Sequence, residues 1–118
     1  MIILNLPFPP SVNTLYRAFK GRNIKSAKGR VFMKEAVLAI KQQDVCEKRS
    51  WRASVTVTLF PPCRRKRDLD NYSKGLLDAI TEAGVWADDS QIDALTILRG
   101  SVEKGGRCEV VIEWFDNE

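Results

Sequence analysis

Histidine is absent from the 118 residues of this chain, and cysteine is scarce. Without an imidazole, neither Ser-His-Asp nor Cys-His catalysis is available, and no zinc site built on histidine can form. The three cysteines, Cys46, Cys63 and Cys108, are odd in number and widely spaced. This spacing argues against a disulfide framework and against a Cys-x-x-Cys metal site, so we expect reduced cysteines that serve in packing.

Long apolar runs, linkers, repeats and low-complexity segments are also missing from the sequence. No stretch approaches the roughly 18 apolar residues that a membrane helix needs. The apolar segment 1–6 lacks the basic region of a signal peptide. We therefore expect one domain over residues 1–118, with no membrane partner, no small-molecule cofactor and a cytoplasmic location.

Charge is divided unevenly between the two halves of the chain. Residues 1–67 hold fifteen Lys or Arg and three Asp or Glu, whereas residues 68–118 hold four and twelve, and the net charge is +4. The first half is suited to attract a polyanion and the second to hold cations. The alternative is a pair of solvated faces, which charge-rich small domains often have.

The two charge types meet in the run Arg64-Arg65-Lys66-Arg67-Asp68-Leu69-Asp70-Asn71. Cations attract phosphate, while carboxylates repel it unless a divalent metal ion lies between them. The run therefore indicates metal-dependent chemistry on a nucleic-acid backbone. It follows an alternating strand pattern at 51–60 and the breaker Pro61-Pro62, so we expect it on a loop that leaves a strand end.

Hydrophobic periodicity predicts an α+β fold with helices packed on a mixed sheet. Residues 103–107 are typical of a hairpin turn because two adjacent glycines favour a tight connection. The predicted strands and helices are, in chain order, a strand at 2–6, a helix at 26–47, a strand at 51–60, a helix at 70–83, a strand at 94–102 and a strand from Cys108 onward.

Residues 11–25 show no clear periodicity, and we expect a loop there. Arg17, Lys20 and Arg22 alternate with Tyr16 and Phe19 in this segment. This mixture fits a loop that contacts phosphates and stacks on exposed bases. A surface loop with ordinary aromatic anchors is the alternative.

Asp68 and Asp70 are the first candidate metal ligands. In an extended chain their side chains project to the same side, and Mg²⁺ favours few carboxylates completed by water and phosphate oxygens. Asp88 and Asp89 would add ligands if the loop after the second helix folds back. The alternative roles are helix capping by Asp70 and pairing of Asp68 with Arg67.

Lys74 is a candidate for stabilising negative charge during a reaction. It follows Asp70 by four residues, one helical turn along the same face, and its ammonium group would oppose charge that develops on a phosphate. The alternative is a surface ladder of ion pairs formed by Asp70, Lys74 and Asp78.

Taken together, these motifs resemble the RusA family of Holliday junction resolvases over nearly the whole chain. The matching segments are Leu6-Pro7-Phe8-Pro9-Pro10-Ser11-Val12-Asn13, the run 64–71, Lys74, the stretch from Asp78 to Gln91, and Lys104-Gly105-Gly106-Arg107. The chain departs from the family chiefly at 14–25 and 44–52.

The resemblance implies a homodimeric endonuclease that resolves four-way DNA junctions with Mg²⁺ or Mn²⁺, often from a prophage gene, in DNA recombination and repair. It implies that Asp68, Asp70 and Asp89 are the essential acids, that Lys74 is the catalytic lysine and that Asp88 is an accessory acid. The expected DNA-binding cations are Arg17, Lys20, Arg22, Arg64, Arg65, Lys66 and Arg67. The alternative function is a non-catalytic protein that binds branched DNA.

Overall fold

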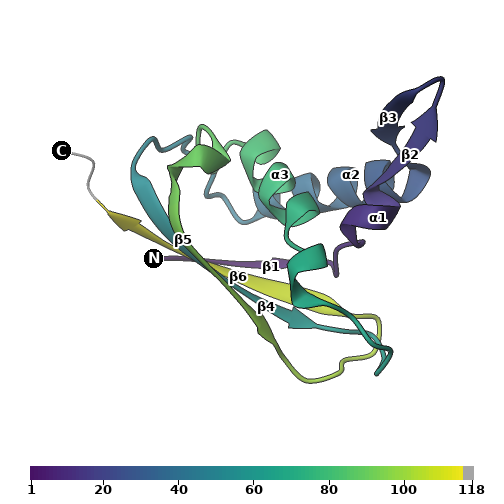
Figure 1. The fold of residues 1–118 in the computed structure, drawn as a ribbon. Helices are drawn as coiled ribbons and strands as arrows, with labels where there is room; N and C mark the ends of the chain where they lie inside the picture. Colours follow the sequence, from purple (N-terminus) through teal and green to yellow (C-terminus); the bar gives the residue numbers. More distant parts are fainter. Residues whose placement is uncertain (116–118) are drawn as a thin grey trace.

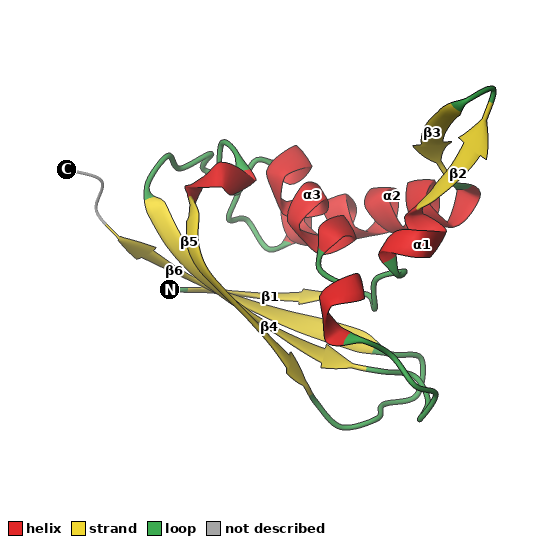
Figure 2. Cartoon of the chain, in the orientation of Figure 1, coloured by secondary structure: helices red, strands yellow, loops and turns green. Residues whose placement is uncertain are grey.

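A computed structural model describes residues 1–115, and these form one mixed four-stranded sheet with helices on one face (Figures 1 and 2). The strand order is β1-β6-β4-β5; β4 and β5 are parallel and the other neighbours antiparallel. The α+β prediction is confirmed. The elements are β1 (Ile2–Leu6), α1 (Val12–Leu15), β2 (Tyr16–Phe19), β3 (Arg22–Lys25), α2 (Ala27–Gln42), β4 (Arg52–Phe60), the 3₁₀ turn η1 (Leu69–Asn71), α3 (Lys74–Ala83), the 3₁₀ turn η2 (Asp89–Gln91), β5 (Ile92–Arg99) and β6 (Arg107–Phe115).

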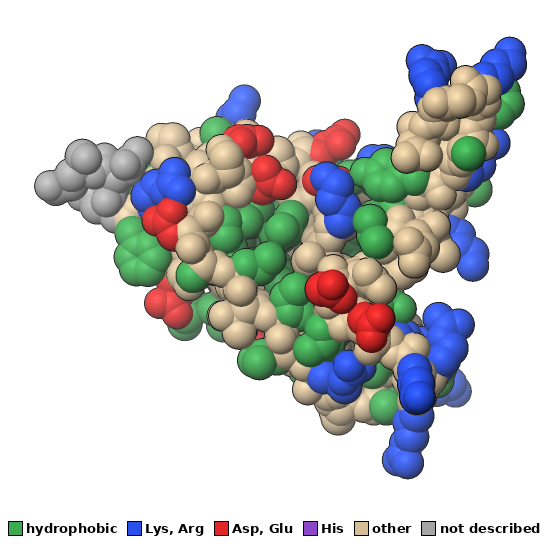
Figure 3. Space-filling view, in the orientation of Figure 1, with side chains coloured by type: hydrophobic (Ala, Val, Ile, Leu, Met, Phe, Trp, Pro, Cys, Tyr) green, Lys and Arg blue, Asp and Glu red, His purple; other side chains and the backbone are tan. Residues whose placement is uncertain are grey.

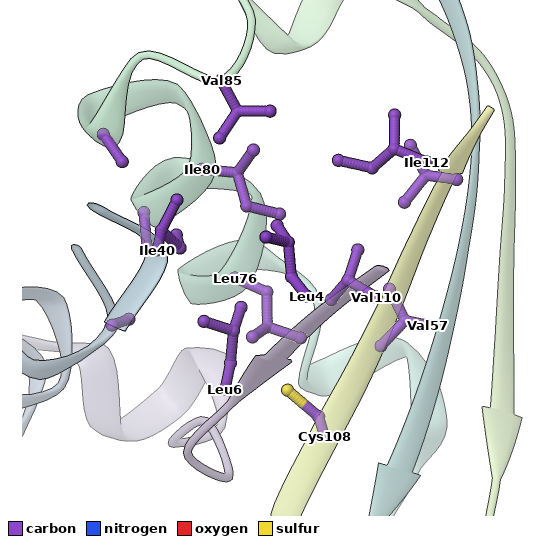
Figure 4. Close-up of a cluster of buried hydrophobic side chains, with 14 of the residues drawn as sticks. Leu4, Leu6, Ile40, Val57, Leu76, Ile80, Val85, Cys108, Val110 and Ile112 are labelled. Atoms are coloured by element: carbon purple, nitrogen blue, oxygen red, sulfur yellow. The ribbon is translucent and has the colours of Figure 1, made fainter. Parts of the chain in front are cut away.

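The core lies between the sheet and helices α2 and α3. Alternate residues of β4 and β6 are buried because successive side chains of a strand point to opposite faces, and only one face is covered. Figure 4 shows side chains of α3 meeting those of β1 and β6. Fully buried members include Leu4, Ile40, Val57, Leu76, Ile80, Val110 and Ile112.

Residues 11–25 are not the irregular loop that we expected. They form the short helix α1 and a separate two-stranded sheet in which β2 pairs with β3. Figure 1 shows this hairpin standing away from the body of the molecule. The prediction failed because the hairpin buries almost nothing, so its strands carry no hydrophobic alternation.

Residues 103–107 form a turn as predicted, but the strands on either side of it, β5 and β6, do not pair with each other as a hairpin. The amide of Gly106 donates to the carbonyl of Glu103 at 2.9 Å, yet β4 lies between β5 and β6. The chain crosses the end of β4, where Gly100 N donates to Leu59 O at 2.7 Å and Glu103 N donates to Pro61 O at 2.9 Å. Because β4, α3 and β5 form a parallel crossover unit, β6 pairs on the opposite side of β4.

Both long helices are shorter than predicted. α2 ends at Gln42, since Asp44 has a φ of 56°, outside helical geometry. α3 begins at Lys74 rather than at Asp70, because residues 69–71 form a 3₁₀ turn and Ser73 occupies the position before the helix. Within residues 1–115, no helix is long and apolar enough to cross a membrane.

The cysteines are reduced, but only one of them serves in packing. Cys108 is buried in β6, and burial raises the pKa of its thiol to about 12. Cys46 and Cys63 are exposed, so the expectation that all three are packing residues was wrong for these two.

Candidate functional site

Lys and Arg side chains gather on two projecting parts of the molecule (Figure 3). One is the β2–β3 hairpin, where Arg17, Lys20 and Arg22 are exposed. The other, which we call the basic loop, is residues 61–68 between β4 and η1. Its Arg64, Arg65 and Lys66 are exposed. The structure thus places six of the seven predicted DNA-binding cations in solvent on two arms.

Arg67, the seventh, is already engaged within the basic loop. Its guanidinium donates to the carbonyls of Cys63 at 2.9 Å and Arg65 at 3.2 Å, and it lies 5.5 Å from the ring centroid of Phe8. These contacts hold the shape of the loop. Arg67 therefore helps to hold Arg64, Arg65 and Lys66 in exposed positions. Its own guanidinium has fewer N–H groups left to bind a phosphate.

Arg99, at the end of β5, was missed by the sequence analysis. Its guanidinium donates to the carbonyl of Arg67 at 2.9 Å. With Asp68 and the four cations 64–67, it lines a hollow of about 340 Å³. An arginine at a strand end carries no sequence signal for this position, because only the sheet pairing brings it beneath the basic loop.

Asp68 and Asp70 lie on either side of the start of η1, and both are exposed. In the part of the chain that is described, neither forms an ion pair or accepts a capping bond. The proposed Asp68–Arg67 pair and helix capping by Asp70 are therefore absent. Asp70 sits in a 3₁₀ turn rather than an extended chain, so the same-side argument from strand geometry does not apply.

The loop after α3 folds back along the helix, as a shared site would require. Gly84 ends α3 in a left-handed conformation with φ 85°, and its carbonyl accepts from Lys48 N at 2.7 Å. Asp88 caps η2: its carboxylate accepts from Ser90 N at 3.1 Å, and hydrogen bonding from Ser90 lowers the pKa of Asp88. Asp88 thus has a structural task that Asp89 lacks.

Lys74 and Asp89 face the same open hollow, about 430 Å³ in volume. The Nζ of Lys74 donates to Oδ1 of Asp78 at 3.2 Å. This bond, with a smaller contribution from the negative charge of Asp89, raises the pKa of Lys74. The predicted ion-pair ladder is half formed, since Lys74 pairs with Asp78 and not with Asp70. The other residues that line the hollow are Lys25, Met33, Thr81, Glu82 and Asp88.

The three predicted essential acids do not form one cluster. Within residues 1–115, no three carboxylates or thiols lie close enough together to hold a metal ion. The tertiary structure brings Asp89 to Lys74, but Asp68 and Asp70 do not line that hollow. A Mg²⁺ ion nevertheless needs only one or two carboxylates when water and substrate phosphates complete its shell. Asp68 and Asp70, which form no ion pair within residues 1–115, supply carboxylates of this kind.

Gln91 positions the loop that carries Asp89. It is buried, and its side chain accepts from the amides of Ala87 at 2.9 Å and Asp88 at 2.8 Å. It also donates to the carbonyls of Arg49 at 2.9 Å and Trp51 at 2.8 Å. Sequence reasoning missed this residue, because a single glutamine gives no local sign that it will be buried.

Replacing Gln91 with Leu should lower the free energy of unfolding by about 2–4 kcal/mol. Four backbone groups lose a partner, and each buried unsatisfied group costs roughly 1–3 kcal/mol, offset where water enters. Urea denaturation measures the change. The matched control is Gln42→Leu at an exposed position of α2, which should change stability by less than about 0.5 kcal/mol. Equal losses in the two variants would contradict the anchoring role.

Comparison with known proteins agrees with the motifs. The family model described as Endodeoxyribonuclease RusA matches residues 7–113. Proteins named crossover junction endodeoxyribonuclease RusA from Escherichia coli strain K12 and from Enterobacteria phage 82 are each 36% identical over 115 residues, which is 98% of this chain and 96% of theirs. A similarly named protein of Escherichia coli O139:H28 is 33% identical over the same shares. The chain therefore belongs to the RusA family of endodeoxyribonucleases.

Proposed function

We propose that this protein is a structure-selective endodeoxyribonuclease that resolves four-way DNA junctions in recombination and repair, acting in the cytoplasm. The observation that carries the proposal is a pair of exposed carboxylates, Asp68 at the end of the basic loop and Asp70 two residues later, neither of which forms an ion pair within residues 1–115. A surface that only bound DNA would gain nothing from two carboxylates beside its phosphate contacts. The names of the relatives support the same activity.

In this proposal Asp68 and Asp70 would hold a divalent ion, Mg²⁺ or Mn²⁺. Asp89 would be the third acid and Asp88 an accessory one, although within residues 1–115 both line the hollow of Lys74 and form no single cluster with Asp68 and Asp70. The chemistry that such an ion supplies is activation of water for attack on phosphorus and neutralisation of the phosphate charge. The products would be 5′-phosphate and 3′-hydroxyl ends, which a ligase can join.

Lys74 has a separate task at the same reaction. Its ammonium group is positively charged at neutral pH, as for any lysine, and that charge opposes the negative charge that develops on the phosphate and the leaving oxygen. Asp78 holds this ammonium group in place through the 3.2 Å bond. The cations of the two arms position the backbone, and they carry no information about base sequence.

We further propose that the working unit is a homodimer. Resolution of a junction into two ligatable duplexes needs symmetric cuts in two opposed strands. A two-fold dimer supplies them because it presents the same site twice, in related orientations.

The test is incubation of the protein with a synthetic four-way junction and Mg²⁺, with each strand labelled in turn. We expect paired nicks at symmetric positions and products that DNA ligase seals. Binding that leaves every strand intact would favour the alternative, a non-catalytic protein that binds branched DNA. Nicking confined to linear duplex would contradict the junction-resolving role and leave the nuclease chemistry standing.

Binding should depend steeply on salt, and the basic loop should account for part of the slope. Each phosphate contact contributes about 0.9 to the slope of log K against log salt concentration. Changing Arg64, Arg65 and Lys66 together to Gln should therefore reduce the slope by up to about 2.7. The measurement is junction affinity across a salt series without Mg²⁺. Lys48→Gln, an exposed cation outside both arms, should leave the slope unchanged; a fall of about 0.9 there, equal to the expected share of each loop residue, would argue against a specific contact.

A further inference from the structure

The β2–β3 hairpin is a narrow, well-defined projection. Its two central residues, Lys20 and Gly21, have φ values of 50° and 75°, which is the geometry of a two-residue hairpin turn, and Phe19 pairs with Arg22 across it. All residues from 17 to 23 are exposed. Figures 1 and 2 show that this hairpin does not join the main sheet.

The hairpin is held firmly at its root. The amide of Ser26 donates to the carbonyl of Leu15 at 2.8 Å, and the Ser26 hydroxyl donates to the carbonyl of Thr14. Gly29 of α2 lies so close that an added Cβ would come within 2.5 Å of the Leu15 carbonyl oxygen. The root of the projection is therefore fixed against the start of α2, and the pairing of β2 with β3 carries the chain out to the tip.

An aromatic ring lies at the tip of this arm with two cations over it, which a stacking base would displace toward its own phosphates. Phe19 is 44% exposed, and the guanidinium of Arg17 and the ammonium of Lys20 lie 5.3 Å and 5.4 Å from its ring centroid. A ring that served in folding would be turned into the core. A ring meant for an apolar protein surface would not be framed by two charges that such a surface must desolvate. A nucleobase with its flanking phosphates matches both features.

We propose that the ring of Phe19 is a nucleobase-binding site, which stacks on a base opened at the branch point of the junction while Arg17, Lys20 and Arg22 contact the neighbouring phosphates. This inference rests on the proposed junction-resolving function. In a linear duplex every base face is covered by its neighbours, so the ring has nothing to stack on. At a branch point the stack is interrupted and a base face is available at lower cost. Phe19 thus favours junctions over duplex, which phosphate contacts alone do not do.

The experiment compares the native protein with Phe19→Ala, Phe19→Trp and the control Phe115→Ala, without Mg²⁺ so that the DNA stays intact. Phe115 is 49% exposed on β6, outside the hairpin. Affinity is measured for a four-way junction and for a linear duplex. A 2-aminopurine at the branch point reports, through its fluorescence, whether that base is unstacked.

Phe19→Ala should weaken junction binding by about 5- to 150-fold, the range for loss of one stacked base, and leave duplex affinity within about twofold. The 2-aminopurine signal should stay at its value in the free junction. Phe19→Trp should restore both properties, and Phe115→Ala should behave as the native protein. Native junction preference in Phe19→Ala, or equal losses on junction and duplex, would overturn this inference alone. A native protein that does not distinguish junction from duplex would overturn the proposed function with it.

Discussion

Replacing Asp70 with Asn should reduce cleavage of a four-way junction by about 10²–10³-fold, the range for loss of one preorganised electrostatic group in an active site. The substitution keeps the shape of the side chain and removes its charge. Because the Asp70 carboxylate is exposed and forms no ion pair within residues 1–115, the fold should be unaffected. The rate is measured as single-turnover cleavage of a labelled junction.

Binding provides the second readout for this variant. Asp70→Asn removes a negative charge that repels DNA phosphate, so its affinity for the junction in the absence of metal should equal or exceed that of the native protein. Asp93→Asn is the control, since Asp93 is also an exposed carboxylate but pairs with Arg52 between β4 and β5. It should cleave at the native rate. Full activity in Asp70→Asn would show that the essential acids have been misassigned.

Replacing Trp86 with Ala should lower the free energy of unfolding by about 3–5 kcal/mol, the usual cost of deleting a large buried aromatic side chain. Trp86 is fully buried, and its indole Nε1 donates to Oγ1 of Thr81 at 2.6 Å. It is the last buried residue before the loop that carries Asp88 and Asp89. Urea denaturation should show a lower midpoint, and the surviving folded fraction should cleave poorly because this loop loses its anchor.

Trp51→Ala is the matched control for Trp86. Trp51 is 38% exposed, and its ring carries the guanidinium of Arg49 at 4.5 Å. Loss of this exposed cation–π contact should cost only about 0.5–1 kcal/mol. If the two tryptophan variants lost equal stability, burial of Trp86 would not be the reason for its effect.

The strands and helices that bury one face were predictable because burial leaves a periodic record in the sequence. β4 and β6 alternate between apolar and polar residues, and α2 repeats apolar residues at helical spacing. The β2–β3 hairpin was not predicted because most of its residues are exposed to solvent. Without a buried face, its strands show no alternation of apolar and polar residues. The pairing of β5 with β4 instead of β6 was not predicted because strand order depends on contacts between residues far apart in the chain.

For the candidate site, the sequence predicts which side chains take part, but it does not predict how they are arranged. The absence of histidine, the run 64–71 and the motifs shared with the RusA family predict that the acids, Lys74 and the basic residues form the site, and these assignments stay predictions. The sequence did not predict which of these side chains form hydrogen bonds within the protein and which stay available to a ligand. The side chains of Arg67 and Asp88 form hydrogen bonds within their own loops, whereas the Asp70 side chain forms none in the described part of the chain, residues 1–115.

By itself, the sequence determined the class of elements, the family and the chemical groups available, since each of these is recorded in local periodicity or in a contiguous motif. Only the tertiary structure decided which groups meet. It brings Asp89 and Lys74 to one hollow, whereas Asp68 and Asp70 are not among the residues that line it. The physical reason is that these positions depend on buried side chains such as Gln91. Gln91 bonds to the backbone of Arg49, 42 residues away, and a local sequence pattern does not predict a contact over that distance.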